Sequence, residues 1–184
     1  MSRIFFYSLF FTILISGCSP QLSPFTRSLV QEYQYDDQAL SQIQFYLSDD
    51  LVLHRELSQG ESTINEGRIS IRNGRRVEEI VFREGTPGVF EFSPGDQRLA
   101  ISFERNQDHY LIFGPTKNRR SYQGKEGVYR LLAKKWEGNY GLVTYGGKEY
   151  YTPAQSAYVT LLVDIDEKAK VERRVKEVDG RVIR

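Results

Sequence analysis

The chain has 184 residues, enough for one domain and hardly enough for two. Lys and Arg number 25 and Asp and Glu 24, and Arg3 is the only charged residue among the first 17, so the remaining chain is electrically balanced. This balance excludes the broad basic surface of a nucleic-acid-binding protein. One cysteine and two histidines exclude an internal disulfide, a cysteine-based zinc site and a histidine-rich metal centre. We therefore expect a folded domain without a metal or another cofactor.

The N-terminus has the pattern of an export signal. Arg3 supplies a positive charge, and residues 4–15 form an apolar run of 12 residues. A helix that crosses a bilayer needs about 20 residues, so this run is too short to span and suits the apolar region of a signal peptide. The run ends in Ile15-Ser16-Gly17-Cys18. This segment resembles the lipobox of bacterial lipoproteins, in which small residues precede an invariant cysteine.

The resemblance covers residues 1–18 alone and leaves the family of the rest of the chain open. It implies cleavage between Gly17 and Cys18, a diacylglycerol group on the Cys18 thiol and an acyl chain, such as palmitate, on the new amino group. Several acyl chains give durable membrane anchoring where one chain does not. Ser19 follows the cysteine where Asp would favour retention in the inner membrane, and no acidic cluster follows it. The implied location is the outer membrane, with the domain facing the periplasm.

Three segments are expected along the chain. Residues 1–17 form the signal peptide, residues 18–27 form the lipidated cysteine and a tether rich in Pro and Ser, and residues 28–184 form a single β-rich domain. A short helix is predicted near the start of the domain because Asp36 can cap it, while Ala39, Leu40 and Ile43 share one face.

Beyond this helix the apolar residues alternate with a period of two, which is typical of strands. The clearest alternating segments are 45–47, 51–57, 69–71, 99–103 and 159–165. No alternation of strands with helices occurs, which excludes a parallel doubly wound fold. The predicted fold is all-β and mainly antiparallel, a single small barrel or β-sandwich of about 9–11 short strands after a short N-terminal helix.

Two hairpins have a predicted register. Gly146-Gly147 should pair Val143 with Tyr150 and Tyr145 with Lys148. At Asn73-Gly74, a two-residue loop places Arg76 opposite Ile71, whereas a three-residue loop places Val77 there, which suits a core face. Glu78-Glu79 then interrupts the alternation. We predict a bulge at this loop, a bulge at Glu78-Glu79, or both. Residues 167–177 fit either an edge strand or a charged helix.

No catalytic set is evident. His54 lies in an alternating run and His109 in a turn, and adjacent carboxylates on a strand point to opposite faces. Asp164 and Asp166 share a face but supply too few oxygens for calcium. Residues 117–120 form a basic loop that suits contact with lipid phosphate or a polyanionic polymer.

Aromatic residues are concentrated in one stretch of 30 residues. Tyr has an apolar ring and a polar tip, and it is frequent at interfaces and in sugar-binding clefts, although cross-strand aromatic pairs also stabilise sheets. The candidate binding surface comprises Tyr129, Trp136, Tyr145, Tyr150 and Tyr151, and Tyr140 and Tyr158 lie in the same stretch.

The expected function is that of a membrane-anchored envelope lipoprotein whose β domain is not an enzyme. The domain would act as a binding or accessory module for an envelope protein or polymer, with the membrane engaged through the lipid at Cys18. One alternative is a lipocalin-like carrier of a small apolar ligand, which rests on fold analogy alone. A hydrolase that uses carboxylates is the least favoured alternative.

Overall fold

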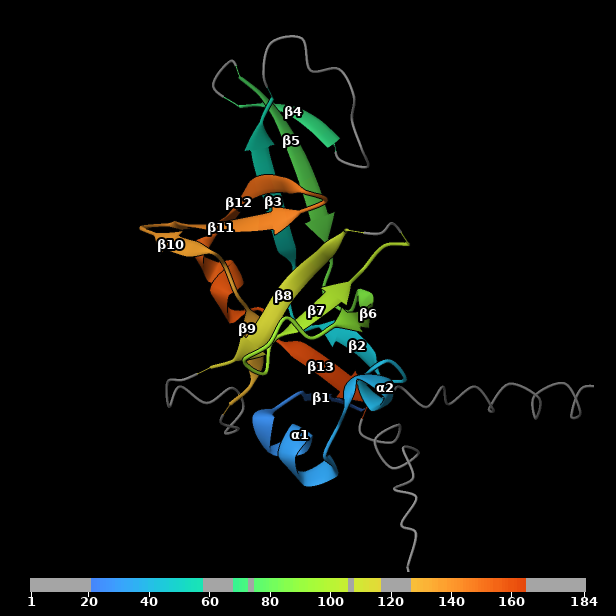
Figure 1. The fold of residues 1–184 in the computed structure, drawn as a ribbon. Helices are drawn as coiled ribbons and strands as arrows, with labels where there is room; N and C mark the ends of the chain where they lie inside the picture. The colour runs from blue at the N-terminus through green and yellow to red at the C-terminus, as the bar shows by residue number, and fades with distance from the viewer. Residues whose placement is uncertain (1–20, 58–67, 73–74, 106–107, 117–126, 165–184) are drawn as a thin grey trace, which may run out of the picture.

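The computed structural model describes residues 21–57, 68–72, 75–105, 108–116 and 127–164 and consists mainly of antiparallel strands in two sheets (Figure 1). Sheet 1 contains, in spatial order, β1 (Leu22–Pro24), β13 (Leu161–Asp164), β2 (Gln44–Leu47), β6 (Pro87–Phe92), β7 (Leu99–Ser102), β8 (Tyr110–Pro115) and β9 (Tyr129–Leu131). Sheet 2 contains β10 (Lys135–Glu137), β11 (Tyr140–Tyr145), β12 (Lys148–Pro153), β3 (Leu51–Glu56), β5 (Arg75–Phe82) and β4 (Arg68–Arg72). The predicted antiparallel all-β class is confirmed.

Of the two predicted architectures, the two-sheet sandwich is the one that fits. Isolated bridges join Thr26 to Val128 and Arg130 to Thr160, so β9 approaches the residues that flank β1 and β13. The ladders do not continue there, and sheet 1 is not a closed barrel. The described residues form more strands than predicted because β1, β9 and β10 have three residues each, too few for a clear alternation.

Two short helices lie near the N-terminus of the domain, where one was predicted. Helix α1 spans Arg27–Tyr33, and α2 spans Asp37–Leu40. The Asp36 carboxylate accepts a hydrogen bond of 2.8 Å from the Ala39 amide, which confirms the predicted cap. A 3₁₀ helix, η1 (Ala154–Tyr158), packs against β9, β11 and β12.

The predicted tether is too long. Residues 22–24, placed in the tether by their Pro and Ser content, pair with β13 as the edge strand β1. The Phe25 side chain is fully buried, and Thr26 caps α1. Pro24 suits this position because an edge strand tolerates a missing amide donor. The folded domain therefore includes residues 22–26, which were assigned to the tether.

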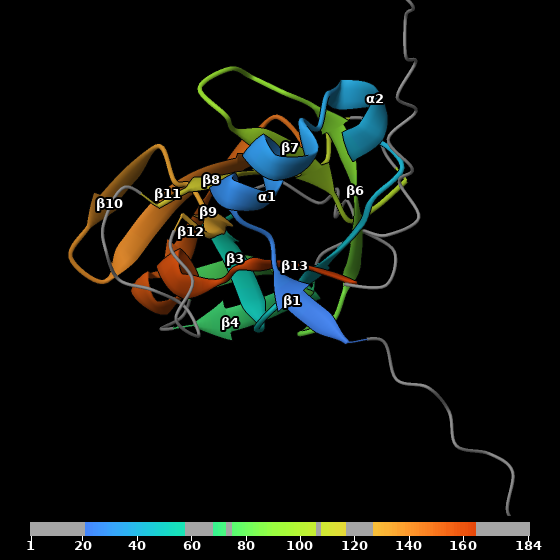
Figure 2. The same cartoon turned by 90° about the horizontal axis from the view of Figure 1, so that it is seen from below.

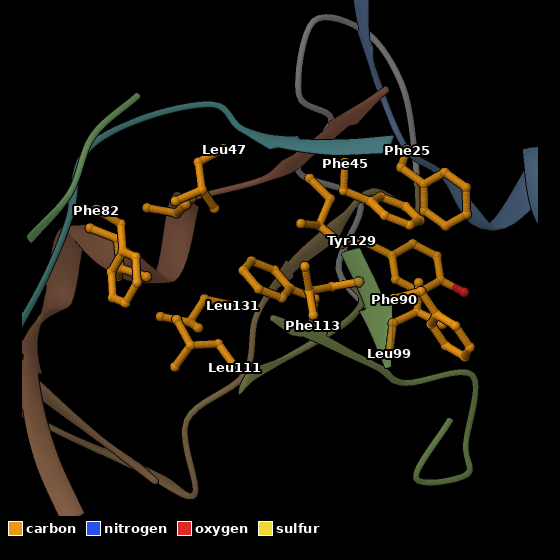
Figure 3. Packing of buried hydrophobic residues seen from close by; sticks show 14 of the residues in the cluster. Phe25, Phe45, Leu47, Phe82, Phe90, Leu99, Leu111, Phe113, Tyr129 and Leu131 are labelled. Atoms are coloured by element: carbon orange, nitrogen blue, oxygen red, sulfur yellow. The ribbon is translucent and has the colours of Figure 1, made fainter. Parts of the chain in front are cut away.

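The core lies inside the curl of sheet 1 and continues under sheet 2 (Figure 3). Phe25 packs against Phe45 and Tyr129, with ring centroids 5.2 and 4.9 Å apart. Sheet 2 contributes Phe82, whose ring packs against Tyr145 at 5.5 Å. Large packed side chains thus occupy the interior in which a lipocalin-like carrier would hold its ligand.

The two ends of the molecule differ. Figure 1 places β1, α1 and α2 toward one end of the molecule and the β3–β5–β4 part of sheet 2 toward the other, and Figure 2 views the molecule from the α1 end. Any group attached just before β1 is therefore attached at the end opposite to this part of sheet 2.

The two predicted hairpins have opposite outcomes. Strands β11 and β12 pair Val143 with Tyr150 and Tyr145 with Lys148, as predicted. Strands β4 and β5 pair without a register shift from Arg72 opposite Arg75 to Arg68 opposite Glu79, so the predicted bulges are wrong. Strands β3 and β5 are also in continuous register.

The bulge prediction failed because it assumed that no carboxylate would point into the core. Glu78 shares the inward face of β5 with Ile80 and Phe82, and its side chain is 1% exposed. Its charge is matched by Arg55, directly opposite on β3, whose Nε lies 2.5 Å from Glu78 Oε2. The Tyr150 hydroxyl donates to the same oxygen at 3.1 Å. A buried charge is tolerated when it is paired and hydrogen-bonded in this way.

These contacts form a row across sheet 2, which we call the buried polar row: Tyr150 on β12, Arg55 on β3 and Glu78 on β5. The Arg55 guanidinium carbon also lies 5.7 Å from the centroid of the Tyr150 ring. Each member approaches the next across a strand pair, so the row favours the observed register of three strands. A shift by one residue would bring Glu79 inward in place of Glu78.

Replacing one member of this ion pair should destabilise the fold more than replacing both members. We expect Arg55→Leu to lower the free energy of unfolding by about 3–5 kcal/mol, because Glu78 would stay buried without its cation. Arg55→Leu combined with Glu78→Leu should recover most of this loss. Urea unfolding measures both effects.

The exposed pair between Arg83 and Asp50 is a matched control, with side chains 76% and 48% exposed. Arg83→Leu should change stability far less than Arg55→Leu does, because water screens an exposed ion pair. A double variant as unstable as the sum of Arg55→Leu and Glu78→Leu would show that the two side chains do not interact.

Candidate binding surface

The outward side of sheet 2 carries a group of aromatic and aliphatic residues. Alternate residues of a strand point to opposite faces, so the neighbours of the buried polar row point outward. Tyr151 pairs with Leu142 on one side and with His54 on the other, and His54 pairs with Glu79. The next outward row, in the same register, contains Tyr140, Pro153, Val52 and Val81. We call these two rows together the aromatic face.

Three rings form the centre of the aromatic face. The His54 ring lies 5.6 Å from the Tyr140 ring and 6.1 Å from the Tyr151 ring, measured between centroids. Tyr140 is on β11 and His54 on β3, so this contact reaches across β12. Both tyrosines are nevertheless 50% exposed. Their rings are therefore held by neighbours while about half of each side chain remains available to a partner.

The charges beside the aromatic face are matched. On the edge strand β10, Lys135 pairs in register with Leu142 and forms an ion pair with Glu137. At the hairpin end, Lys134 Nζ lies 3.0 Å from Glu149 Oε1. Each of these lysines thus has a carboxylate partner, and this border presents no excess of positive charge.

The structure divides the residues predicted for the binding surface. Tyr151 lies on the aromatic face. Tyr129, Tyr145 and Tyr150 are buried, which corrects their placement on an exposed surface, and they act as packing residues. The predicted group is therefore not one surface.

Trp136 is exposed but lies apart from the aromatic face. It pairs with Gly141, whose side of sheet 2 is inward, and its ring covers that glycine closely. A Cβ at position 141 would lie 2.5 Å from the ring. Any larger residue there would displace Trp136, so the contact explains the glycine.

Tyr140 and His54 were not among the predicted surface residues. The predicted hairpin register does contain the signal for Tyr140: if Tyr150 faces Val143, then Tyr151 and Tyr140 both lie on the opposite side. His54 joins them only through the pairing of β12 with β3, which no local pattern indicates.

The two histidines of the chain occupy separate positions. His54 lies on a strand face and His109 precedes β8, as expected from their sequence positions, and His109 packs against Tyr145 with a centroid distance of 5.0 Å. Within the described ranges, no three His, Cys, Asp or Glu residues are grouped so that they could hold a metal ion. Gly17, Cys18, residues 117–120, Asp166 and residues 167–177 lie outside the described residues.

The Asp50 carboxylate accepts hydrogen bonds from two residues of the neighbouring β5–β6 connection. The Glu84 amide and the Arg83 side chain both donate to its carboxylate, at 2.8 and 2.7 Å. The amide first, and then Arg83, lower the pKa of Asp50 below its usual value. This carboxylate holds the β5–β6 connection and forms no pair with Asp49 of the kind that a hydrolase needs.

No helix in the part of the chain that the structure describes has the length and apolar character needed to cross a membrane. The chain matches no protein-family model, and comparisons with curated proteins and with solved structures found no match.

The buried polar row makes stability sensitive to alkaline pH. Burial raises the pKa of Tyr150 above its usual value, Glu78 raises it further, and Arg55 acts in the opposite direction. A raised pKa in the folded state gives stability that is complete below the unfolded pKa, about 10, and is lost as the pH rises through the folded pKa.

We expect Tyr150→Phe to be less stable than the unaltered protein at neutral pH but to lose less stability between about pH 9 and 11. Denaturant unfolding at each pH measures the loss. Tyr151→Phe, on the neighbouring exposed position, should behave as the unaltered protein does. An identical pH profile for Tyr150→Phe and the unaltered protein would contradict this account.

Proposed function

We propose that the protein is a lipid-anchored lipoprotein of the bacterial envelope whose β domain is a non-enzymatic binding module. The observation that carries the binding role is the aromatic face, with Tyr140 and Tyr151 each half exposed and held against His54. Aromatic residues with an apolar ring and a polar tip are enriched in interfaces. The lipobox-like Ile15–Cys18 segment supports the anchor.

The position of the domain relative to Cys18 supports the same function. Strand β1 begins at Leu22, and four residues of extended chain span at most about 14 Å. A lipid on Cys18 would therefore hold the β1 end of the molecule close to the bilayer. In Figure 1, β11 and β12, which carry Tyr140 and Tyr151, lie between the β1 end and the β3–β5–β4 part of sheet 2. We therefore expect the aromatic face to be held clear of the membrane surface.

A surface role is favoured over catalysis by what surrounds the titratable groups. The paired Glu78 and Arg55 are buried within sheet 2, and His54 contacts two tyrosine rings. Nucleophilic catalysis needs a nucleophile, a base and an orienting group that converge on one point, and the two rows that make up the aromatic face contain no Ser, Thr or Cys that could act as the nucleophile.

Site-specific photo-crosslinking in intact cells of the native host tests this function. A photoreactive amino acid at Val81, 39% exposed at the border of the aromatic face, leaves the three rings unchanged. The matched control is the same probe at Val89, 46% exposed on β6 of sheet 1. We expect a discrete adduct with an envelope component from position 81 and not from position 89.

The adduct should depend on the rings and on the anchor. Tyr151→Ala should abolish it, whereas Tyr158→Ala, which removes a tyrosine of similar exposure on η1, should not. Both variants should keep the melting temperature within a few degrees, since surface changes usually cost less than about 0.5 kcal/mol. Cys18→Ala should move the protein out of the membrane fraction. Equal adducts from both probe positions, or no adduct from position 81, would contradict the binding role.

A further inference from the structure

We infer that the aromatic face binds an uncharged saccharide chain, an inference that rests on the proposed binding function and specifies its ligand. A pyranose ring presents apolar C–H groups on its faces and hydroxyl groups around its edge. Tyr140 and Tyr151 offer the complementary combination, because each has an apolar ring and a hydroxyl donor and acceptor.

The size of the aromatic face suits a narrow ligand. Four neighbouring strands, β11, β12, β3 and β5, span about 14 Å across the sheet, and the two rows of outward residues lie about 7 Å apart. A stable protein partner usually buries about 800 Å² on each side, which is several times the area of such a strip. A chain a few sugar rings long is a closer match.

The charges beside the face select among envelope polymers. An anionic polymer needs unpaired cations, yet Lys134 is paired with Glu149 and Lys135 with Glu137. The two rows themselves include the carboxylate of Glu79, and Arg68 lies directly opposite it on β4, so the charges in register with the face are of both signs. The face is therefore suited to an uncharged segment of glycan and not to a phosphate-rich or sulfated one.

The rings of Tyr140 and Tyr151 are held in place before a ligand binds. His54 contacts both tyrosine rings, at 5.6 and 6.1 Å, from a different strand. Side chains already held by neighbours lose less conformational freedom on binding, which favours affinity.

Binding of a neutral oligosaccharide to the purified full-length lipidated protein in detergent tests the inference. The probes are a β-1,4-linked hexamer of N-acetylglucosamine, measured by calorimetry, and isolated cell-wall sacculi, measured by co-sedimentation. We expect saturable binding of both probes, and no binding of heparin, a sulfated polysaccharide. Loss of one stacking ring, in Tyr140→Ala or Tyr151→Ala, should weaken the hexamer by at least about tenfold.

Two further variants assign the effect to the face. Tyr151→Trp should retain binding because it keeps an aromatic ring, and Tyr158→Ala should bind as the unaltered protein does. Circular dichroism of each variant confirms that the fold is intact. Unchanged binding by both Tyr140→Ala and Tyr151→Ala would overturn the location.

Failure of the saccharide and failure of the binding function give different results. Absence of saturable binding to both glycan probes, combined with a protein adduct from the probe at Val81 in cells, overturns the saccharide and leaves the binding role. Absence of both glycan binding and any adduct overturns both. Tighter binding of heparin than of the neutral hexamer overturns the charge argument.

Discussion

The register that β12 and β5 share with β3 determines what sheet 2 buries and what it exposes. In this register Arg55 lies opposite Glu78, and the Tyr150 hydroxyl reaches the same carboxylate. The positions next to them, His54 and Tyr151, consequently point outward. A shift by one residue would exchange the two rows, so the buried ion pair and the exposed rings depend on one another.

The buried polar row specifies the structure at an energetic cost. A well-packed apolar pair in place of Arg55 and Glu78 would avoid the desolvation of two charges. The charged pair, however, disfavours any register that leaves one of the two charges in the core without its partner. At the border of the same sheet, the short strand β10 carries Lys135 and Glu137, and charges on a short edge strand discourage pairing with another chain. Sheet 2 can thus present aromatic rings while its β10 edge is protected.

The sequence was most informative where the structure depends on neighbours along the chain. The alternation of apolar residues predicts the strand class, Gly146-Gly147 predicts the register of β11 and β12, and Asp36 predicts its helix cap. Each of these features is determined by residues a few positions apart, where period, turn chemistry and capping act directly.

Features that depend on distant pairing were missed. Tyr151 pairs with His54 almost 100 positions earlier, so the aromatic face could not be assembled from local patterns. Glu78 was assigned to a bulge because its partner Arg55 lies on another strand. Strand β1 was hidden by Pro24, since the edge position that makes proline acceptable is known only from the fold. The prediction that Tyr150 and Tyr151 share one surface was avoidable from the sequence alone, because adjacent residues of a strand point to opposite faces.

Tyrosine nitration of the folded protein, read by tandem mass spectrometry at individual residues, tests the central claim most directly. The account predicts that Tyr151 and Tyr140 react in the folded state, whereas Tyr150, 3% exposed beside them in sequence, reacts only after unfolding in denaturant. Reaction of Tyr150 at the rate of Tyr151 in the folded protein would contradict the register and, with it, both the buried polar row and the aromatic face.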